Sequence, residues 1–279
     1  MTRDQRAALP LVLPALTAVA LVAIAPMVWT IWESLHLHDL RMPWLGQPFI
    51  GFDNYAEAAG DPRFRDSVLH TVVFVLASVT LELTLGLVFA LAMSRALRGR
   101  ALIRVVVLAS WAVPTVVAAL VWRFIFEGLE FAWFIDPVLA WVPIVLADAW
   151  KMTPFVALLL LAGLESIDPS LYDAARIDGA SAWRQFREIT LPLLRPALLV
   201  AVLFRALDAF RVFDVIYVMT GGGPGTSTEP VSLYTFNTIL QHLRFGYGSA
   251  LSVMIFLATF LLALVYIRLV GRNLLEQRA

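Results

Sequence analysis

Residues 171–196 read LYDAARIDGASAWRQFREITLPLLRP, a polar stretch that separates two long apolar segments. Its apolar residues recur at helical spacing, and Gly179 lies near its centre. In a membrane protein, a polar stretch at this place is a cytoplasmic loop. Regular apolar spacing inside such a loop predicts a helical element that docks onto a soluble partner.

Two short helices joined at Gly179 are expected here. Asp168-Pro169 is a strong start signal, because aspartate caps free N–H groups and proline fits the first helical position. Ser181 can cap the second helix, and Leu191-Pro192 with Pro196 are expected to end the unit. The apolar positions of the pair are Leu171, Ala174, Ala175, Ile177, Trp183, Phe186 and Ile189.

An amphipathic helix lying on the membrane surface is the alternative for this stretch. Such a helix is usually uniformly basic on its polar face. Here acidic residues interleave with the arginines, which favours the docking element. The residues concerned are Asp173, Asp178 and Glu188 with Arg176, Arg184 and Arg187.

The composition of the 279-residue chain indicates an integral membrane protein. It is 60% hydrophobic and only 15% charged, with a mean hydropathy of +0.80, whereas a soluble domain has about a quarter charged residues. Cysteine is absent, which excludes disulfides and thiolate metal sites. The formal net charge is zero and says nothing about partners.

Six segments are long enough to cross a hydrocarbon core of about 30 Å, which takes roughly 20 residues. The expected spans are 10–32, 67–93, 105–126, 139–163, 197–219 and 248–270. The first apolar run continues through Trp32, too long for the roughly 7–15-residue core of a signal peptide, so an uncleaved helix is expected. The predicted fold class is an all-α polytopic membrane protein.

The arginines orient these spans by the positive-inside rule. With both termini in the cytoplasm, only Arg41, Arg63, Arg65 and Arg244 lie in the outer loops. Segments 33–66 and 220–247 are then extracytoplasmic, and 164–196 is the main cytoplasmic loop. The inner side holds Arg3, Arg6, Arg95, Arg98, Arg100, Arg104, Arg176, Arg184, Arg187, Arg195, Arg268, Arg272 and Arg278.

The outer segment 33–66 predicts a short helix that Asp53 caps and Asp61-Pro62 ends. We interpret it as an interfacial helix held by Phe52, Tyr55 and Phe64, with contact to an extracellular partner as the alternative. Inside the spans, prolines predict kinks or breaks, which are tolerated where freed carbonyls find neighbours or line a cavity. These are Pro114, Pro143 and Pro154.

Parts of the polar stretch resemble the cytoplasmic loop of binding-protein-dependent ABC importer permeases. The matching residues are Asp173-Ala174-Ala175, Asp178-Gly179-Ala180 and Ile189-Thr190-Leu191-Pro192. Asp173 stands where that family usually has glutamate, which preserves the charge with a shorter reach.

The resemblance extends over nearly the whole chain. Several stretches look like the carbohydrate branch of these permeases: Phe49–Tyr55, Asp61-Pro62, Trp150–Phe155 and Phe213–Pro224. Leu203–Met219 is most similar to permeases for disaccharides such as trehalose or maltose.

The resemblance implies a permease subunit of the bacterial cytoplasmic (inner) membrane, paired with a second permease. Two copies of an ATPase would dock inside, and a solute-binding protein would deliver a carbohydrate outside. ATP binding would move residues 171–188 and turn the cavity from inward- to outward-facing, and hydrolysis would reset it. The implied coupling residues are Asp173, Ala174, Ala175, Asp178, Gly179, Ala180, Trp183 and Phe186.

The chain is not expected to hydrolyse ATP itself. A P-loop needs G-x-x-x-x-G-K-[ST], but the single lysine is Lys151 and the run Gly221-Gly222-Gly223-Pro224 contains none. ATP and Mg would be used by the partner ATPase, and no cofactor, metal or nucleic acid is expected on this chain. The glycine-rich loop 220–230 looks flexible, and the resemblance places it at the outer mouth.

Eight ionisable residues fall within the expected spans. A charge at the centre of a span costs about 2.5–3.5 kcal/mol on insertion scales, so each needs a partner or water. They are Glu82, Arg123, Asp148, Lys151, Arg205, Asp208, Arg211 and Asp214.

The fifth span concentrates these charges. On a continuous helix, Asp208, Arg211 and Asp214 share an arc of about 120° with Phe204, and Arg205 lies off that arc. One interpretation makes the charges ion pairs that hold helices and subunits together. The other makes the arc, with the aromatic rings of Phe210, Phe213 and Tyr217, the lining of a pathway for a sugar. Lys151 and Asp148 either complete that pathway or pair with each other.

The predicted function is therefore the permease subunit of an ATP-driven carbohydrate importer. A proton-coupled secondary transporter would use the buried carboxylates and need no docking loop, and no internal repeat of the kind common in such transporters is evident. Two further classes compete with it: a permease for a non-sugar solute such as glycerol phosphate, and an intramembrane enzyme. The four histidines form no metal-binding arrangement.

Overall fold

The structure is a computed structural model that describes residues 13–14, 17–94, 100–129 and 131–276. The described residues are mainly helical, and their extended pairing is limited to the isolated bridges His36–Phe49 and Asp39–Arg244, which confirms the all-α prediction. Arg3, Arg6, Arg95, Arg98 and Arg278, which orient the chain in the sequence-based prediction, lie outside the described residues.

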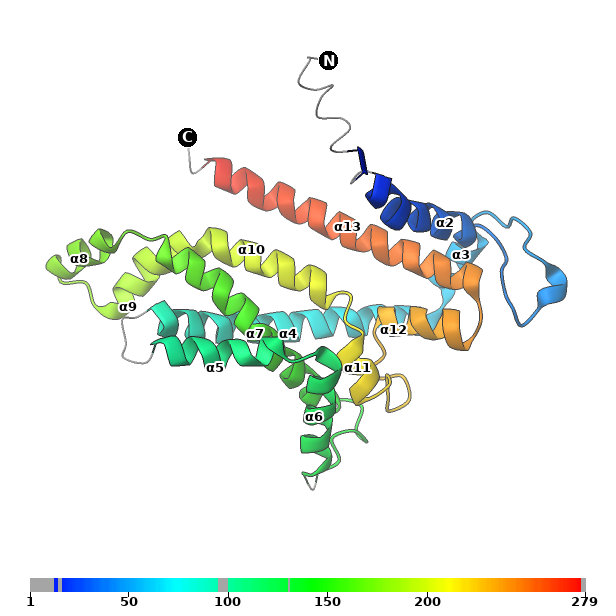
Figure 1. The fold of residues 1–279 in the computed structure, drawn as a ribbon, viewed down its shortest axis with the longest axis horizontal. Helices are drawn as coiled ribbons and strands as arrows, with labels where there is room; N and C mark the ends of the chain where they lie inside the picture. The colour runs from blue at the N-terminus through cyan, green and yellow to red at the C-terminus, as the bar shows by residue number, and fades with distance from the viewer. Residues whose placement is uncertain (1–12, 15–16, 95–99, 130, 277–279) are drawn as a thin grey trace, which may run out of the picture. The chain divides into compact units, whose positions relative to one another are not determined.

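The elements follow one another along the chain as helices with π-type or 3₁₀ turns (Figure 1). They are η1 (Ala20–Ile24), α2 (Ala25–Ser34), η2 (Pro43–Leu45), α3 (Asp53–Gly60), α4 (Pro62–Ser94), α5 (Arg100–Ala112), α6 (Thr115–Glu127), α7 (Trp141–Glu165), α8 (Pro169–Ile177), α9 (Ala182–Gln185), η3 (Phe186–Thr190), α10 (Leu191–Ala209), α11 (Asp214–Met219), α12 (Val231–Phe236), η4 (Asn237–Gln241) and α13 (Phe245–Glu276).

Five helices of the described chain are long and apolar enough to cross a membrane. They are Thr17–Ser34, Pro62–Ser94, Trp141–Glu165, Ala182–Ala209 and Phe245–Arg268. Four correspond to expected spans. The expected spans 105–126 and 197–219 differ, because neither is one continuous helix.

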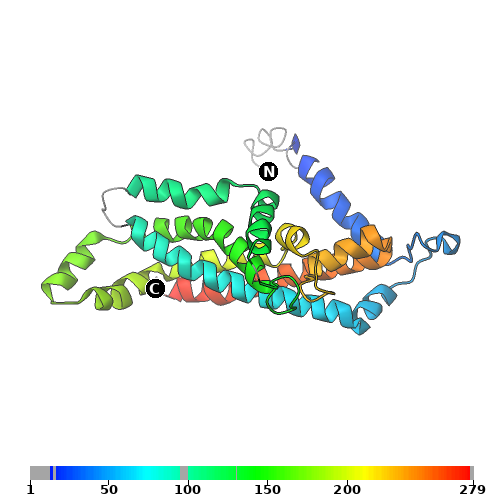
Figure 2. The same cartoon turned by 90° about the horizontal axis from the view of Figure 1, so that it is seen from below.

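The expected span 105–126 is broken into α5 and α6 at Val113-Pro114. Pro114 has φ −56° and ψ 140°, an extended conformation, and it has no N–H to continue the ladder of α5. Figures 1 and 2 show α6 leaving α5 at a steep angle. The break predicted at Pro114 is therefore confirmed.

The expected helix 197–219 is wrong, since α10 ends at Ala209 and α11 begins at Asp214. The hydroxyl of Ser232 donates to the carbonyl of Val212 in this interruption. A carbonyl freed by the break thus gains a partner from a distant part of the chain. At its other end α10 continues α9 through the π-type turn η3, so Leu191-Pro192 and Pro196 do not end the helix as expected.

Two compact units make up the chain, residues 1–65 with 234–258 and residues 66–233 with 259–279. In the first unit, the amide of Asn54 donates to the carbonyls of Ser34 at 2.8 Å and His36 at 3.1 Å. Asp53 is the first residue of α3 and makes no capping hydrogen bond, so its expected capping role is wrong. Asp61 follows the end of α3, as predicted.

Asp61 joins the start of α4 to α12 and α13 within the first unit. Its carboxylate accepts hydrogen bonds from the hydroxyls of Tyr234 and Tyr247, the latter at 2.9 Å. Burial opposes ionisation, but these donors keep the pKa of Asp61 below its ordinary value. The guanidinium of Arg63 lies 5.4 Å from the ring centroid of Tyr234.

In the second unit, α7 packs against α4 and α10 over small residues. A Cβ on Gly86 would lie 2.6 Å from Val156, and one on Gly163 would lie 2.5 Å from Ala197. Small residues let helices approach closely, which is how helices associate in lipid. The buried residues of this core are Ala90, Met93, Val156, Ala157, Leu160, Leu161, Leu194 and Ala201.

The loop 220–230 is well anchored within the second unit, contrary to its flexible appearance in the sequence. The hydroxyls of Thr220 and Thr228 lie 2.8 Å apart, and the indole of Trp141 donates to the carbonyl of Ser227 at 3.2 Å. A ring nitrogen of His70 lies 3.2 Å from the carbonyl oxygen of Glu229. Hydrogen bonds to neighbouring helices therefore hold the loop in place.

Candidate transport cavity and docking element

A polar cavity of about 140 Å³ lies where the two helix breaks meet α7. Its lining comes from the start of α6, from α7, from the end of α10 and from the start of α11. The lining residues are Thr115, Asp148, Lys151, Met152, Arg205, Asp208, Ala209, Arg211, Val212, Phe213, Asp214 and Val215. Charged side chains and interrupted backbone thus converge where a membrane helix would otherwise be continuous.

Arg205 is the centre of an ion-pair cluster in the wall of this cavity. Its guanidinium donates to both carboxylate oxygens of Glu82, one at 2.7 Å, to Asp148 at 3.1 Å and to Asp208 at 2.5 Å. The side chains of Arg205 and Glu82 are 1% and 0% exposed. The cluster therefore joins α4, α7 and α10 through one side chain.

The cluster around Arg205 contains more acidic than basic side chains. One guanidinium faces three carboxylates, so the fully ionised group has a net charge of one minus three, or −2. A buried charge without a partner is costly. Asp208 is 54% exposed and reaches the cavity, so part of this charge is solvated rather than buried.

The predicted pathway residues divide between cavity and surroundings. Lys151, Asp208, Arg211 and Asp214 all line the cavity, although Asp214 belongs to α11 and not to a common helical arc with Asp208. Arg211 is 68% exposed, and its guanidinium nitrogen lies 4.0 Å from Asp208. Asp208, Arg211 and Asp214 are therefore close together because the chain turns between α10 and α11, and not because they share one face of a continuous helix.

Three of the four predicted aromatic residues, Phe204, Phe210 and Tyr217, are not among the residues that line the cavity. Phe204 is 55% exposed and packs edge-on against Phe155 with ring centroids 6.5 Å apart. Tyr217 stacks on Phe213 at 5.2 Å. Phe210 is half-buried at the turn after α10. Phe213 is the predicted aromatic residue that lies at the cavity.

Lys151 is not paired with Asp148, although their spacing in the sequence allows that pair. Its ammonium donates to the carbonyl of Val113 at 2.5 Å, with the carbonyl of Trp111 at 3.5 Å. Asp148 pairs with Arg205 instead. The two charges of α7 therefore have different partners.

The predicted docking element consists of α8 and α9, and its caps are as expected. The carboxylate of Asp168 accepts from the N–H of Ser170 at 2.9 Å, which lowers the pKa of Asp168. The hydroxyl of Ser181 accepts from the N–H of Arg184 at 3.3 Å. Gly179 has φ +74°, the left-handed conformation that favours glycine after a helix.

The chain reverses at Gly179 through a closed hydrogen-bond pattern. The N–H of Ala180 donates to the carbonyl of Ala175 at 2.8 Å, and that of Gly179 to Arg176 at 3.1 Å. A Cβ at Gly179 would meet nothing within 4 Å, so the backbone conformation alone requires glycine here. Asp178 precedes it as the residue that ends α8.

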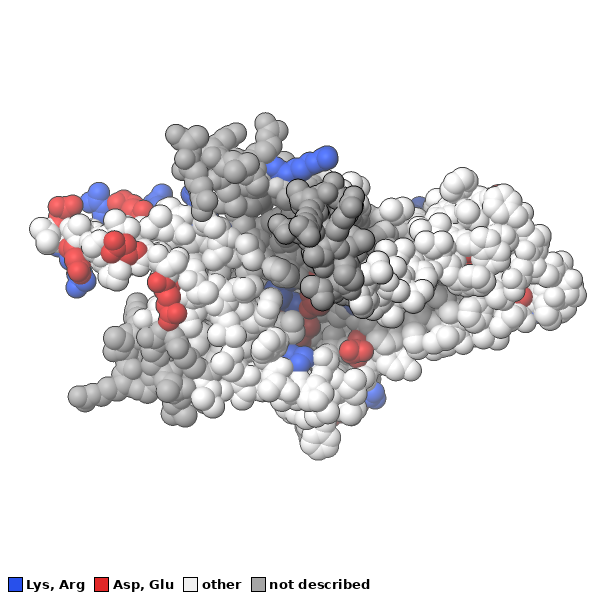
Figure 3. Space-filling model, turned by 45° about the horizontal axis from the view of Figure 1, so that its top comes forward, with Lys and Arg blue, Asp and Glu red and all other residues white. Residues whose placement is uncertain are grey.

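Charged side chains gather on the surface over α8 and α9, at the left of Figure 3. Asp173 pairs with Arg176, and Arg184 with Glu188 at 2.9 Å. Between them two large apolar side chains are exposed, Ile177 at 88% and Trp183 at 69%. Ala174 is exposed, and Ala175 and Ala180 are half-buried.

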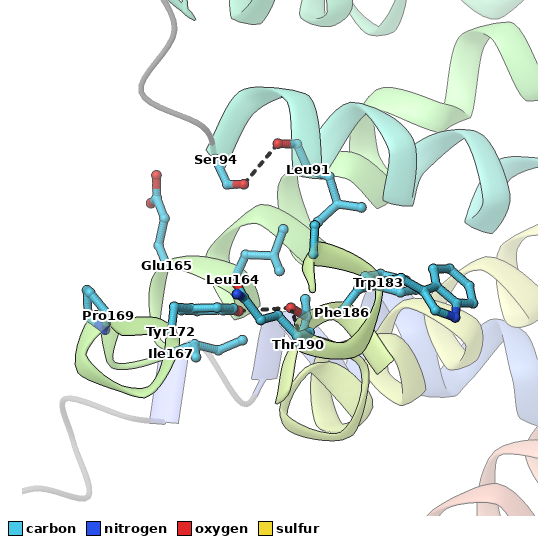
Figure 4. A pocket seen from close by; sticks show the side chains of 12 residues that line it. Leu91, Ser94, Leu164, Glu165, Ile167, Pro169, Tyr172, Trp183, Phe186 and Thr190 are labelled. Carbon is cyan, nitrogen blue, oxygen red and sulfur yellow. Dashed lines mark hydrogen bonds between the residues drawn. The ribbon is translucent and has the colours of Figure 1, made fainter. Parts of the chain in front are cut away.

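A second cavity of about 790 Å³ lies between this element and the ends of α4 and α7 (Figure 4). The hydroxyl of Tyr172 on α8 lies 3.0 Å from that of Thr190, which links the two sides of the element. The ring of Phe186 stacks on that of Trp183 at 5.6 Å. Both contacts lie within residues 172–190, on the side of the cavity that faces the ends of α4 and α7.

Sequence reasoning missed Arg205, Glu82 and Asp148 as members of one cluster. It identified each as a charge within a span, but it placed Arg205 off the functional arc. The useful signal was present, since acidic residues and an arginine in charge-poor segments need partners. The spacing of these residues along the sequence does not show which helices pack together.

The chain is similar to known proteins in sequence. The family described as "Binding-protein-dependent transport system inner membrane component" matches residues 82–278. The trehalose/maltose transport system permease protein MalF of Thermococcus litoralis is 43% identical over 285 residues, covering 97% of this chain and 95% of that protein. The trehalose transport system permease protein SugA of Mycobacterium tuberculosis is 38% identical over 278 residues, covering 96% and 90%.

A solved structure has the same fold. It is a crystal structure of a bacterial ABC transporter involved in the import of the acidic polysaccharide alginate. One of its chains matches with a TM-score of 0.80 and 20% identity, over 94% of each chain. At this identity the likeness establishes the fold alone.

Proposed function

Since the chain belongs to the family of binding-protein-dependent transport system inner membrane components, we propose that it is the permease subunit of an ATP-driven importer for a disaccharide or short oligosaccharide. Trehalose and maltose are the first candidates, because relatives of 43% and 38% identity are named for their transport. This similarity over nearly the full length of each chain is the observation on which the proposal rests.

The substrate pathway runs past the polar cavity at the two helix breaks. Asp208, Arg211, Asp214 and Lys151 line it. Carboxylates accept from sugar hydroxyls, the exposed guanidinium of Arg211 donates to them, and the ring of Phe213 offers an apolar face for the C–H surface of a sugar. Phe204, Phe210 and Tyr217 would contribute at other stages of the pathway, since they do not line the cavity itself.

Coupling to a separate ATPase uses residues 171–188. The exposed Ile177 and Trp183 provide apolar contacts, and the solvated ion pairs around them provide a polar rim, as expected of a protein-binding surface. Asp173, Ala174, Ala175, Asp178, Gly179, Ala180, Trp183 and Phe186 form this element. ATP and Mg would be bound by the ATPase and not by this chain.

The partners of the complete importer are a second permease, two ATPase copies and an extracytoplasmic solute-binding protein. The last is supported by a structural relative of TM-score 0.80, which is described as a bacterial alginate ABC transporter in complex with an alginate pentasaccharide-bound periplasmic protein. Isolation of the chain from its native membrane in mild detergent tests this set. Recovery of the chain alone, still folded, would contradict it and favour a secondary transporter.

Uptake by cells with and without the gene for this chain tests the substrate class. Labelled trehalose and maltose should accumulate only when the chain is present, and glycerol 3-phosphate should not. Vanadate should abolish the uptake, whereas an uncoupler should leave its initial rate largely intact. Sensitivity to the uncoupler with resistance to vanadate would instead support the proton-coupled alternative.

A further inference from the structure

The carbonyl end of α5 is left open by the break at Val113-Pro114. The last four carbonyls of an α-helix have no intrahelical donors, and Pro114 has no N–H to offer. The N–H of Val113 turns back to the carbonyl of Ser110 at 3.4 Å. The next helix does not continue this ladder, because α6 starts its own with Ala118 donating to Pro114 at 3.0 Å.

Lys151 of α7 supplies the missing donor. Its ammonium lies 2.5 Å from the carbonyl oxygen of Val113 and 3.5 Å from that of Trp111. Among the described residues, no carboxylate lies within 4 Å of this ammonium, although Asp208 lines the same cavity. A cation at the C-terminal end of a helix is stabilised by the helix dipole as well as by the hydrogen bonds.

The residue type suits this task. Lys151 is the single lysine of the chain, and every other permanently cationic side chain is arginine. A compact ammonium with three donors can reach two backbone carbonyls at the end of one flexible stem, whereas the planar guanidinium suits carboxylates. Arg205, which lines the same cavity, has that second role with Glu82.

We propose that Lys151 is a positioning residue, not a ligand for the solute: it binds the carbonyl end of α5 and thereby holds the break between α5 and α6 against α7. Thr115, the first residue of α6, lines the cavity directly after this break. The shape of the cavity at this point therefore depends on a contact between Lys151 and the backbone.

The test measures the break without reference to any solute. The chain has no cysteine, so Thr115→Cys adds a single thiol, whose reaction with methyl methanethiosulfonate is followed in membranes that contain the full chain. Lys151→Met in this background should release the start of α6 and so expose the thiol more often. The reaction should become about tenfold faster, the factor that corresponds to losing a hydrogen bond to a charged group. Removing a positive charge by itself would slow the reaction, because it raises the pKa of the thiol.

Two matched variants and a second reporter complete the test. Lys151→Arg keeps the positive charge but replaces the compact ammonium with a planar guanidinium, so its rate should lie between those of the parent and Lys151→Met. Met152→Leu alters an uncharged neighbour that also lines the cavity and should leave the rate unchanged. Val156→Cys, in the buried core of the second unit and without the Thr115→Cys change, should stay unreactive in all backgrounds, which shows that the fold is retained.

A Thr115→Cys rate that is unchanged or lower in Lys151→Met, with Val156→Cys still unreactive, would overturn the proposal. Disaccharide uptake gives a second readout, which rests on the proposed function. Lys151→Met should lower the maximal rate and change KM by less than about twofold. A raised KM with an unchanged thiol rate would make Lys151 a solute ligand. Failure of uptake in the parent chain would refute the proposed function and leave the thiol result intact.

Discussion

The element α8–α9 and the cluster around Arg205 use the same residue types in opposite ways. In α8–α9 the ion pairs join residues three or four positions apart, and Asp173 and Arg176 are each 65% exposed. Around Arg205 the pairs join three helices, and Arg205 and Glu82 are almost fully buried. Solvated local pairs contribute little to stability, whereas breaking a buried pair is costly.

We call the Arg205 cluster the joint, because its buried pairs hold α4, α7 and α10 together. The surface of α8–α9 is exposed and can change its contacts. The pairs of α8–α9 exchange partners at little cost, so that surface can meet another protein. Glu82 and Asp148, which are largely buried against one guanidinium, have no such freedom. A charged residue in the sequence of a membrane protein can therefore be assigned to neither role until its burial is known.

Removing the guanidinium at the centre of the cluster should have the largest effect. Arg205→Met leaves Glu82 and Asp148 without their cation and should destabilise the chain by about 3–5 kcal/mol, measured by equilibrium unfolding in detergent. Arg211→Met is the matched control, since Arg211 is 68% exposed, and should change stability by less than about 0.5 kcal/mol. Equal effects of the two variants would remove the distinction between joint and surface.

A change in the docking element should affect coupling while the spans remain folded. Gly179→Leu forces a left-handed conformation on a side chain that disfavours it, at a cost of about 1 kcal/mol. Sugar uptake should fall to background while ATP hydrolysis by the purified complex persists. Gly179→Asn, which tolerates this conformation, should retain uptake. Coupled transport in Gly179→Leu would argue against a docking role.

Asp208 belongs to the Arg205 cluster and also lines the polar cavity, so its carboxylate can serve the joint or the substrate pathway. Asp208→Asn keeps an acceptor oxygen and the side-chain size, so assembly of the complex should survive. Uptake should weaken about tenfold, as expected when one charge-assisted hydrogen bond is lost. A complex that no longer assembles in Asp208→Asn would assign this carboxylate to the joint and not to the pathway.

The smallest expected effect concerns the cap of α8. The pKa of Asp168 is lowered by the N–H of Ser170, so its stabilising effect is present above the ordinary pKa and is lost as pH falls through the lower pKa of the folded state. Asp168→Ala should reduce the helicity of α8 near neutral pH, and Asp168→Asn should preserve it. Amide hydrogen exchange of residues 170–177 measures this, and equal protection in both variants would exclude the cap.

Residue pattern alone determined the all-α class, most of the apolar spans and the two capped helices around Gly179. These features depend on local physics: hydrophobic length, a side chain that caps the next turn, and a glycine where the backbone needs a positive φ. The family resemblance followed from the same local pattern. For this reason α8–α9 could be described before its fold was known.

Only the tertiary structure decided where α10 ends and which charges meet. The helix expected over 197–219 stops at Ala209, and Ser232, 20 residues beyond Val212, supplies a donor for the carbonyl that the break frees. Arg205 and Glu82 are 123 positions apart in sequence. Helical periodicity relates residues within a few turns, but the partner of a buried charge depends on which helices pack together, and packing is a property of the whole chain.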